Sequence, residues 1–143
     1  MTEFNIPASV TNLGNGVFSY CTALNNITVD EENKNYQSID GNVYTKDGKT
    51  LVQYAVGKPN SSFKVPNGVE SIAAHSFVGA LKLGSLNVPN TVTSIGESAF
   101  SGCNGFYYIA FEGTITEWGD VTKGYYWQSK VKEVYCSDGT TKP

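Results

Sequence analysis

Arginine is absent from this sequence of 143 residues, and side chains suited to catalysis are scarce. Ten lysines stand against thirteen acidic residues, for a net charge of −3. Recognition of nucleic-acid phosphates depends on clustered Lys and Arg, so this composition argues against a nucleic-acid partner. One histidine and three cysteines leave few groups for acid–base or nucleophilic chemistry. We therefore expect a protein that is not an enzyme and needs no cofactor.

Long apolar runs are absent as well. No segment approaches the roughly 18–20 apolar residues of a membrane-spanning helix, so we expect no membrane insertion. Residues 1–7 lack the basic and apolar blocks of a signal peptide, which fits a cytosolic protein or a secreted one whose signal has been removed. The composition, 40% hydrophobic and 16% charged, is that of a folded chain. The length suits a single domain over residues 1–143.

The sequence contains an internal repeat. The segment Val65–Ile72, VPNGVESI, returns 23 residues later as VPNTVTSI at Val88–Ile95, and Ile6–Leu13 is a third version. Apolar or small residues then follow each proline at fixed distances. These columns are Val10, Val69, Val92 and Ile115; Leu13, Ile72, Ile95 and Trp118; Gly14, Ala73, Gly96 and Gly119; Phe18, Phe77 and Phe100; and Leu24, Leu83 and Phe106.

Each repeat ends in an alternating apolar pair, such as Leu86 and Val88 or Ile109 and Phe111, which predicts a short strand with one face toward a core. A single coil of 23 residues cannot bury these columns, but stacked coils can. The period lies within the range of about 20–29 residues of leucine-rich repeats. The sequence therefore predicts a leucine-rich-repeat solenoid with short parallel strands, loops and single helical turns.

The consensus V-P-x-x-V-T-x-I-G-x-x-A-F-x-x-C-x-x-L-x-x-I-x-V closely resembles the BspA-type leucine-rich repeats, and residues 88–111 match it almost position for position. The resemblance extends over nearly the whole chain. Proteins of this family are typically secreted or surface-attached in bacteria of animal mucosa, and they are linked with adhesion. The resemblance thus implies an extracellular or cell-surface location and a host or matrix protein or glycan as partner.

Two coils depart from the period. The coil over residues 30–65 is longer, and its β-rich runs on either side of Asp47-Gly48 predict an inserted β-hairpin, which would protrude from the solenoid or cover one side. The last coil, residues 112–143, is degenerate, and we interpret it as a C-terminal cap whose bulky aromatics close the core. The aromatic run is Tyr125-Tyr126-Trp127.

No comparable cap is visible at the N-terminus, where Phe4 and Ile6 already occupy strand positions. Two interpretations remain open. Further repeats precede these residues in a longer protein, or the first strand is an open edge that can associate with the edge of a neighbour.

The reactive residues favour structural roles. His75 stands in a loop, without a second histidine, and a solvated loop residue is preferred over a catalytic base. Cys21 and Cys103 share one column three coils apart, roughly 14 Å at the spacing of parallel strands, which is too far for a disulfide. Together with Cys136 they are expected to be free, buried thiols. The run Asp30-Glu31-Glu32 lacks the spacing of a calcium loop, so solvated turn charges are preferred over a metal site.

The outward strand positions pave one face of the sheet, a surface that leucine-rich repeats often use for partners. The expected outward residues are Asn26, Thr28, Ser62, Lys64, Ser85, Asn87, Tyr108, Ala110, Glu133 and Tyr135. Tyrosine is favoured at interfaces, and we place Tyr108 and Tyr135 at equivalent positions of adjacent strands. The candidate binding face is Lys64, Asn87, Tyr108, Glu133 and Tyr135. The alternative is that the two tyrosines only shield the capping coil.

Two functions of different kinds follow. The first is a non-catalytic binding or adhesion module that engages its partner through the sheet face or the hairpin. The second is a structural spacer that displays other domains without binding a ligand itself. A contiguous aromatic patch favours the first, and a face of Ser, Thr and Asn alone would favour the second.

Overall fold

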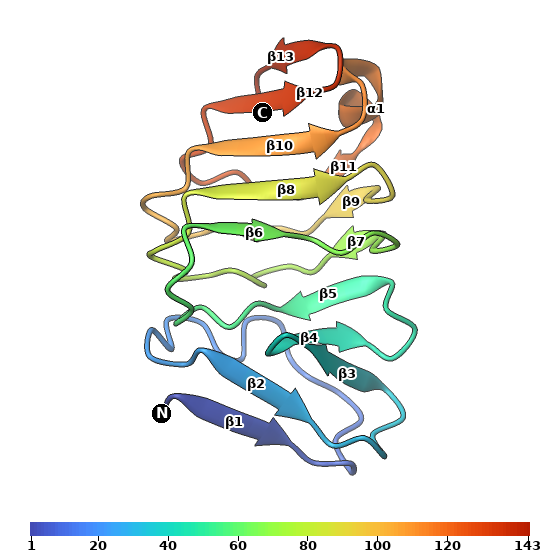
Figure 1. Cartoon of the computed structure of the whole chain (residues 1–143), viewed down its shortest axis with the longest axis vertical. Helices are drawn as coiled ribbons and strands as arrows, with labels where there is room; N and C mark the ends of the chain where they lie inside the picture. Colours follow the sequence, from blue (N-terminus) through green and yellow to red (C-terminus); the bar gives the residue numbers. More distant parts are fainter.

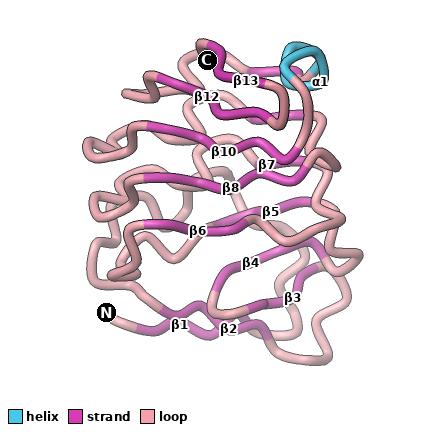
Figure 2. The backbone as a smooth tube through the Cα atoms, turned by 45° about the horizontal axis from the view of Figure 1, so that its top comes forward, coloured by secondary structure: helices cyan, strands magenta, loops and turns pink.

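The computed structural model describes residues 1–143 and is a β-solenoid of about six turns. Figure 1 shows the coils stacked from the N-terminus to the C-terminus, with strands on two sides of the stack. The tube in Figure 2 shows that most of the remaining chain is loop. The predicted leucine-rich-repeat solenoid is confirmed.

A front sheet carries the strand at the end of each repeat, and its order is β13-β12-β10-β8-β6. Strands β6, β8, β10 and β12 pair in parallel, with Ser62 beside Ser85 and Ser85 beside Tyr108. Each of these paired residues is 23 residues from the next, which is the repeat period of the sequence. A separate parallel pair, β1 and β2, forms the N-terminal end. The bounds are β1 Glu3–Ile6, β2 Asn26–Val29, β6 Ser62–Lys64, β8 Ser85–Pro89, β10 Tyr108–Glu112, β12 Glu133–Cys136 and β13 Gly139–Thr141.

A back sheet has the order β11-β9-β7-β5-β4-β3. Its strands β7 and β9 are only two residues long and carry the column isoleucines Ile72 and Ile95, which pair in register. The bounds are β3 Tyr36–Ile39, β4 Asn42–Thr45, β5 Thr50–Gln53, β7 Ser71–Ile72, β9 Ser94–Ile95 and β11 Thr122–Lys123.

The core lies between the two sheets and consists mainly of the predicted columns, together with residues of the long second coil such as Tyr44 and Leu51. Phe77 and Phe100 are fully buried, with ring centroids 5.0 Å apart. Trp127 lies beyond Phe100, at 6.5 Å, so the aromatic column continues into the last coil. One cluster of 25 buried residues runs from Tyr44 to Val134, and a separate cluster of seven serves the N-terminal coils. The core is thus divided at the long second coil.

The loop that contains His75 repeats in conformation rather than in chemistry. Gly16, His75 and Ser98 occupy equivalent places and all have left-handed backbone, with φ of 66°, 58° and 51°. Because few side chains tolerate this conformation, the position is defined by its backbone angle. The chemistry of the side chain is not repeated, which supports a structural role for His75.

The predicted hairpin is present, as β4 and β5 pair antiparallel around Asp47-Gly48. Of the two placements expected for it, protrusion from the solenoid and coverage of one side, the structure has the second. A further strand, β3, pairs with β4 through a turn in which Asp40 and Gly41 both have positive φ, and all three strands extend the back sheet. Buried Tyr44 and Leu51 bring the insertion into the core, so it forms one wall of the solenoid.

The last coil differs in detail from the prediction. A six-residue helix, α1 (Ile115–Asp120), was not predicted by the sequence reasoning and begins with a Thr114–Glu117 capping box. Ile115 is consequently exposed, while Trp118 is buried against Phe111. The capping pattern T-x-x-E was the sequence signal for this helix.

The aromatic run Tyr125-Tyr126-Trp127 was expected to close the core, but only Trp127 does so. Trp127 is 5% exposed, whereas Tyr125 and Tyr126 are 81% and 86% exposed. Tyr126 has φ 57°, a left-handed turn conformation. Strand β13 then pairs antiparallel with β12 and covers the last edge of the front sheet.

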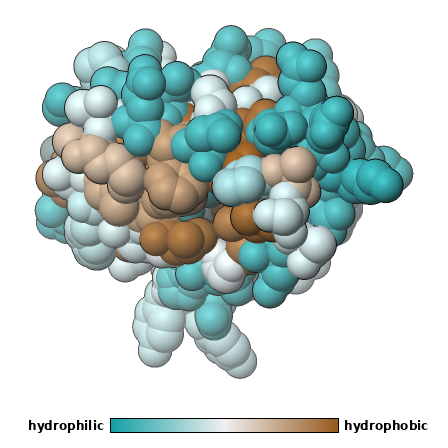
Figure 3. Space-filling model, turned by 90° about the horizontal axis from the view of Figure 1, so that it is seen from below, coloured by the Kyte–Doolittle hydropathy of each residue, from teal (hydrophilic) through white to brown (hydrophobic).

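The N-terminal end has no such covering strand. Strand β1 pairs on one side only, with β2, and Phe4 and Val17 of the first coil are 40% and 49% exposed. Figure 3, which looks onto this end, shows apolar residues gathered in the middle of the face. Association through this edge stays a prediction.

All three cysteines are free, and their environments differ. Cys103 is fully buried, its Sγ–H donates to the Phe77 carbonyl at 3.0 Å, and burial raises the pKa of its thiol to about 12. Cys21 and Cys136 are only half-buried, so the expectation of buried thiols is correct for Cys103 alone.

We expect Ellman's reagent to find three sulfhydryls in the denatured protein. In the native protein Cys21 and Cys136 should react well before Cys103. The thiolate is the reactive form, and the buried Cys103, with its raised pKa, forms little of it. A denatured count below three, or a Cys103→Ala variant that loses a fast-reacting thiol, would contradict this assignment.

Candidate functional site

The front sheet arranges its outward residues in two rows that run across the strands. One row is Ser62, Ser85, Tyr108 and Glu133, and the other is Lys64, Asn87, Ala110 and Tyr135. All five residues of the candidate binding face therefore lie on this sheet, in neighbouring strands. Strand positions hold side chains more rigidly than loops do, which suits a recognition surface.

Three of the five residues form a compact cluster. The rings of Tyr108 and Tyr135 meet edge to face, with centroids 5.3 Å apart and planes at 77°. The Tyr135 hydroxyl donates to Glu133 Oε2 at 2.7 Å, and this hydrogen bond raises the pKa of Tyr135 above its usual value. Tyr108 and Tyr135 remain 41% and 44% exposed, so the cluster presents aromatic area and a carboxylate to solvent.

The positions of the two tyrosines differ from the prediction. They were expected at equivalent positions, but Tyr108 pairs with Glu133, and Tyr135 pairs with Ala110. The prediction that Ile109 and Val134 both point into the core was correct, and the two residues pair in register. The tyrosines are thus diagonal neighbours, a relation that still lets large side chains touch.

Lys64 and Asn87 extend the surface away from this cluster. Both are exposed and adjacent in register on β6 and β8. Lys64 Nζ lies 3.6 Å from Glu112 Oε1, with both side chains well exposed. Such an exposed pair contributes little to stability, so Lys64 can exchange Glu112 for a partner's carboxylate at small cost.

Two aromatic residues were not assigned to any binding surface by the sequence reasoning. Tyr125 and Tyr126 are the most exposed aromatic side chains of the chain, and they lie in a loop rather than on the sheet. The signal available was the replacement of the Phe and Cys columns by the run Gly124-Tyr125-Tyr126-Trp127. Without coordinates, inward and outward members of that run cannot be separated.

Groups for catalysis or metal binding do not converge. His75 Nε2 lies 3.8 Å from Glu97 Oε1, with its side chain about a third exposed. No three His, Cys, Asp or Glu side chains come together as a metal site would require. The single helix, α1, is far too short and polar to cross a membrane.

The stacked 23-residue coils, the phenylalanine column and the parallel front sheet define a leucine-rich-repeat solenoid. The model of the BspA type leucine rich repeat region matches six copies over residues 1–50 and 54–142. The chain belongs to this family. No curated protein matches the sequence.

Solved structures of bacterial proteins share the fold. A leucine-rich repeat protein from Eubacterium ventriosum superposes with a TM-score of 0.65 at 23% identity, over 93% of this chain and 41% of that one. A leucine rich cell surface protein from Faecalibacterium prausnitzii gives 0.57 at 23% identity, over 85% and 51%. The pneumococcal vaccine antigen PcpA gives 0.62 at 19% identity, over 95% and 45%. The chain thus spans about half the length of these proteins or less.

Proposed function

We propose that this chain is a non-catalytic binding module of a secreted or surface-attached bacterial protein. Its partner, a host or matrix protein or glycan, is engaged at the C-terminal end of the front sheet. The proposal is supported by membership of the BspA-type family and by similarity to a cell surface protein and to a vaccine antigen.

The exposed cluster of Tyr108, Glu133 and Tyr135 is the observation that carries the proposal. Tyrosine contributes a large contact area and a polar hydroxyl with few rotatable bonds, which is why it is frequent at binding hot spots. Glu133 holds the Tyr135 hydroxyl, so less side-chain entropy remains to be lost on binding. Lys64 and Asn87 provide charged and polar groups around the aromatic centre, as at the rim of an interface.

Replacement of both tyrosines, Tyr108→Ser with Tyr135→Ser, is expected to abolish adhesion to immobilised extracellular-matrix proteins and to a glycan array. Folding should be nearly intact, because both side chains lie on the outer face of the sheet, 41% and 44% exposed, and outside the core clusters. Circular dichroism and the urea midpoint check folding, and surface-bound protein measures adhesion.

The matched control is Tyr125→Ser with Tyr126→Ser, which removes two exposed tyrosines from a loop outside the sheet. This variant should adhere like the parent. Equal adhesion by the sheet variant would rule out this face as the site. Adhesion by no form of the protein to any surface would favour the structural spacer instead.

A further inference from the structure

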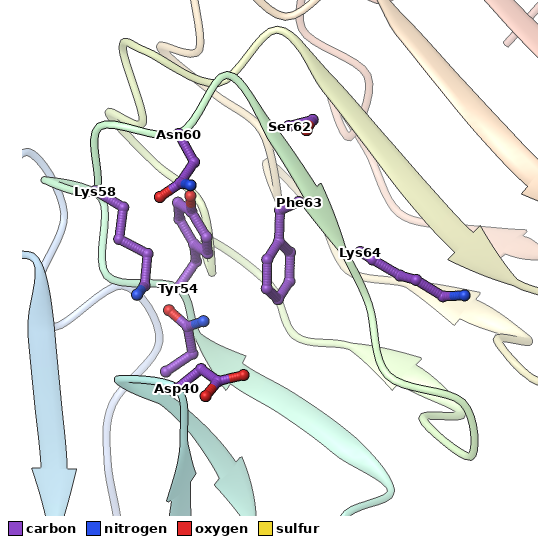
Figure 4. Close-up of a pocket in the computed structure, with 8 residues that line it drawn as sticks. Asp40, Tyr54, Lys58, Asn60, Ser62, Phe63 and Lys64 are labelled. Carbon is purple, nitrogen blue, oxygen red and sulfur yellow. The ribbon is translucent and has the colours of Figure 1, made fainter.

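The front sheet is interrupted between β2 and β6, and a cavity opens there. Strand β2 pairs only with β1, and β6 pairs only with β8. The turn between β3 and β4 takes the place beside β2, where the Ile27 N–H donates to the Gly41 carbonyl at 2.9 Å. The cavity has a volume of about 300 Å³ and is shown in Figure 4. Its lining is Asp40, Asn42, Tyr54, Lys58, Asn60, Ser62, Phe63 and Lys64.

Two buried polar groups of this lining have no hydrogen-bond partner. They are Asn42 Nδ2 and the Tyr54 hydroxyl, in residues 0% and 1% exposed. Asn42 Oδ1 accepts from the Ala55 N–H at 2.8 Å, so the carbonyl end of the amide is engaged and the NH₂ end is free. Burial raises the pKa of Tyr54 to about 12, so its hydroxyl keeps its proton and can donate.

These unpaired donors are unusual, because buried polar groups nearly always find partners. Leaving such a group unsatisfied costs about 1–3 kcal/mol. The two other buried polar atoms without partners, Gln53 Oε1 and Ser76 Oγ, belong to residues outside the cavity lining. A ligand that accepts hydrogen bonds from Asn42 and Tyr54 would remove the cost at this site.

An aromatic ring forms one wall of the cavity. Phe63 stands in register with Leu86 and, through it, with Ile109, both of which are fully buried. Phe63 itself is only half-buried, because no strand pairs with β6 on its other side. Its ring lies 5.0 Å from that of Tyr54. The interruption of the sheet thus leaves an apolar face beside the unpaired donors.

The rim of the cavity carries side chains of both charges and an uncharged amide. Asp40 and Asn60 offer acceptor oxygens, and the half-buried Lys58 offers an ammonium group. Lys58 is in no ion pair. Figure 4 shows Asp40, Lys58 and Asn60 around Tyr54, whereas Lys64 extends away. The site therefore combines donors, acceptors and an aromatic face without a dominant charge.

We propose that this cavity binds one neutral sugar unit of a glycan. Sugar hydroxyls can accept from Asn42 and Tyr54 and donate to Asp40, and the apolar C–H face of a pyranose ring suits the Phe63 ring. The volume is at the small end of ligand pockets, which fits one ring rather than a long chain. This site goes beyond the proposed binding face. Asp40, Asn42, Tyr54 and Phe63, which would contact the sugar, lie outside that face, and the cavity lining shares only Lys64 with it.

The test is an NMR titration of the ¹⁵N-labelled chain with the methyl glycosides of glucose, galactose, mannose and N-acetylglucosamine. At least one glycoside is expected to give saturable shifts of the Asn42 side-chain NH₂ signals. Tyr54→Phe should weaken this binding about tenfold and leave the urea midpoint unchanged or raised, because it removes an unsatisfied hydroxyl. Asn42→Asp keeps the acceptor for the Ala55 N–H and should also weaken binding.

Two controls separate this site from the tyrosine face. Tyr135→Phe removes a sheet-face hydroxyl, and the Tyr108→Ser, Tyr135→Ser variant removes both rings; both should bind the sugar like the parent. The assignment is overturned if no glycoside gives saturable shifts at Asn42, or if Tyr54→Phe binds equally well. Methyl glucuronide, an acidic sugar, is titrated in parallel, and binding confined to it would overturn the choice of a neutral unit.

Discussion

Phe100→Ala is expected to lower the free energy of unfolding by about 3–5 kcal/mol, the usual cost of deleting a buried phenylalanine. The ring is completely buried. It packs against Phe77 at 5.0 Å and Phe106 at 4.7 Å, and Trp127 of the last coil lies at 6.5 Å. The ring thus joins two successive coils to the C-terminal end, and its removal leaves a cavity that rigid strands on both sides cannot close. Phe77→Ala should have an effect of similar size.

Urea denaturation followed by circular dichroism measures this loss. Leu81→Ala is the matched control, because Leu81 lies in a loop of the same region and is 47% exposed. Its replacement should change the free energy of unfolding by about 0.5 kcal/mol or less. If Phe100→Ala cost no more than Leu81→Ala, the phenylalanine column would not be the core.

Gly96→Ala is expected to destabilise the protein by about 2–3 kcal/mol, the upper part of the roughly 1–3 kcal/mol usual for forcing extra atoms into a closely packed place. A Cβ at residue 96 would lie 2.6 Å from the Cα of Ala74 in the preceding coil, and still closer to the Ala74 nitrogen. The φ of Gly96 is not in the left-handed region, so the requirement is for space rather than for backbone freedom. Backbone atoms cannot move aside as a flexible side chain could.

Gly119 belongs to the same column of the sequence, yet Gly119→Ala should have the opposite sign. It lies in α1, and a Cβ there would meet nothing within 4 Å. Alanine in a helix is favoured over glycine by roughly 0.5–1 kcal/mol, so a small gain in stability is expected. Thermal and urea unfolding of the two variants tests the pair, and a loss in both would show that the last coil keeps the close approach of the regular coils.

The candidate site could be predicted only in part. The alternation of Tyr108, Ile109 and Ala110 was enough to place Tyr108 outward, and Val134 did the same for its neighbours Glu133 and Tyr135. The contact between the tyrosine rings required the register of β10 and β12, because a change of partner by two residues keeps the face but changes the neighbour. The cavity beside β6 had no sequence signal, since Tyr54 and Phe63 are typical strand or core residues and only the fold brings them next to Asn42.

The 23-residue period by itself determined the solenoid, the parallel strand at the end of each repeat and the phenylalanine column, because each coil buries its apolar face only by stacking on a copy of itself. Only the tertiary structure decided the conformation of the two coils that depart from the period. The long second coil joins the back sheet instead of protruding, since its Tyr44 and Leu51 complete the core, and this opens the front sheet beside β6. The last coil forms a helix and sends Tyr125 and Tyr126 outward. In both places no preceding copy prescribes the conformation, so local turns and long-range packing determine it together.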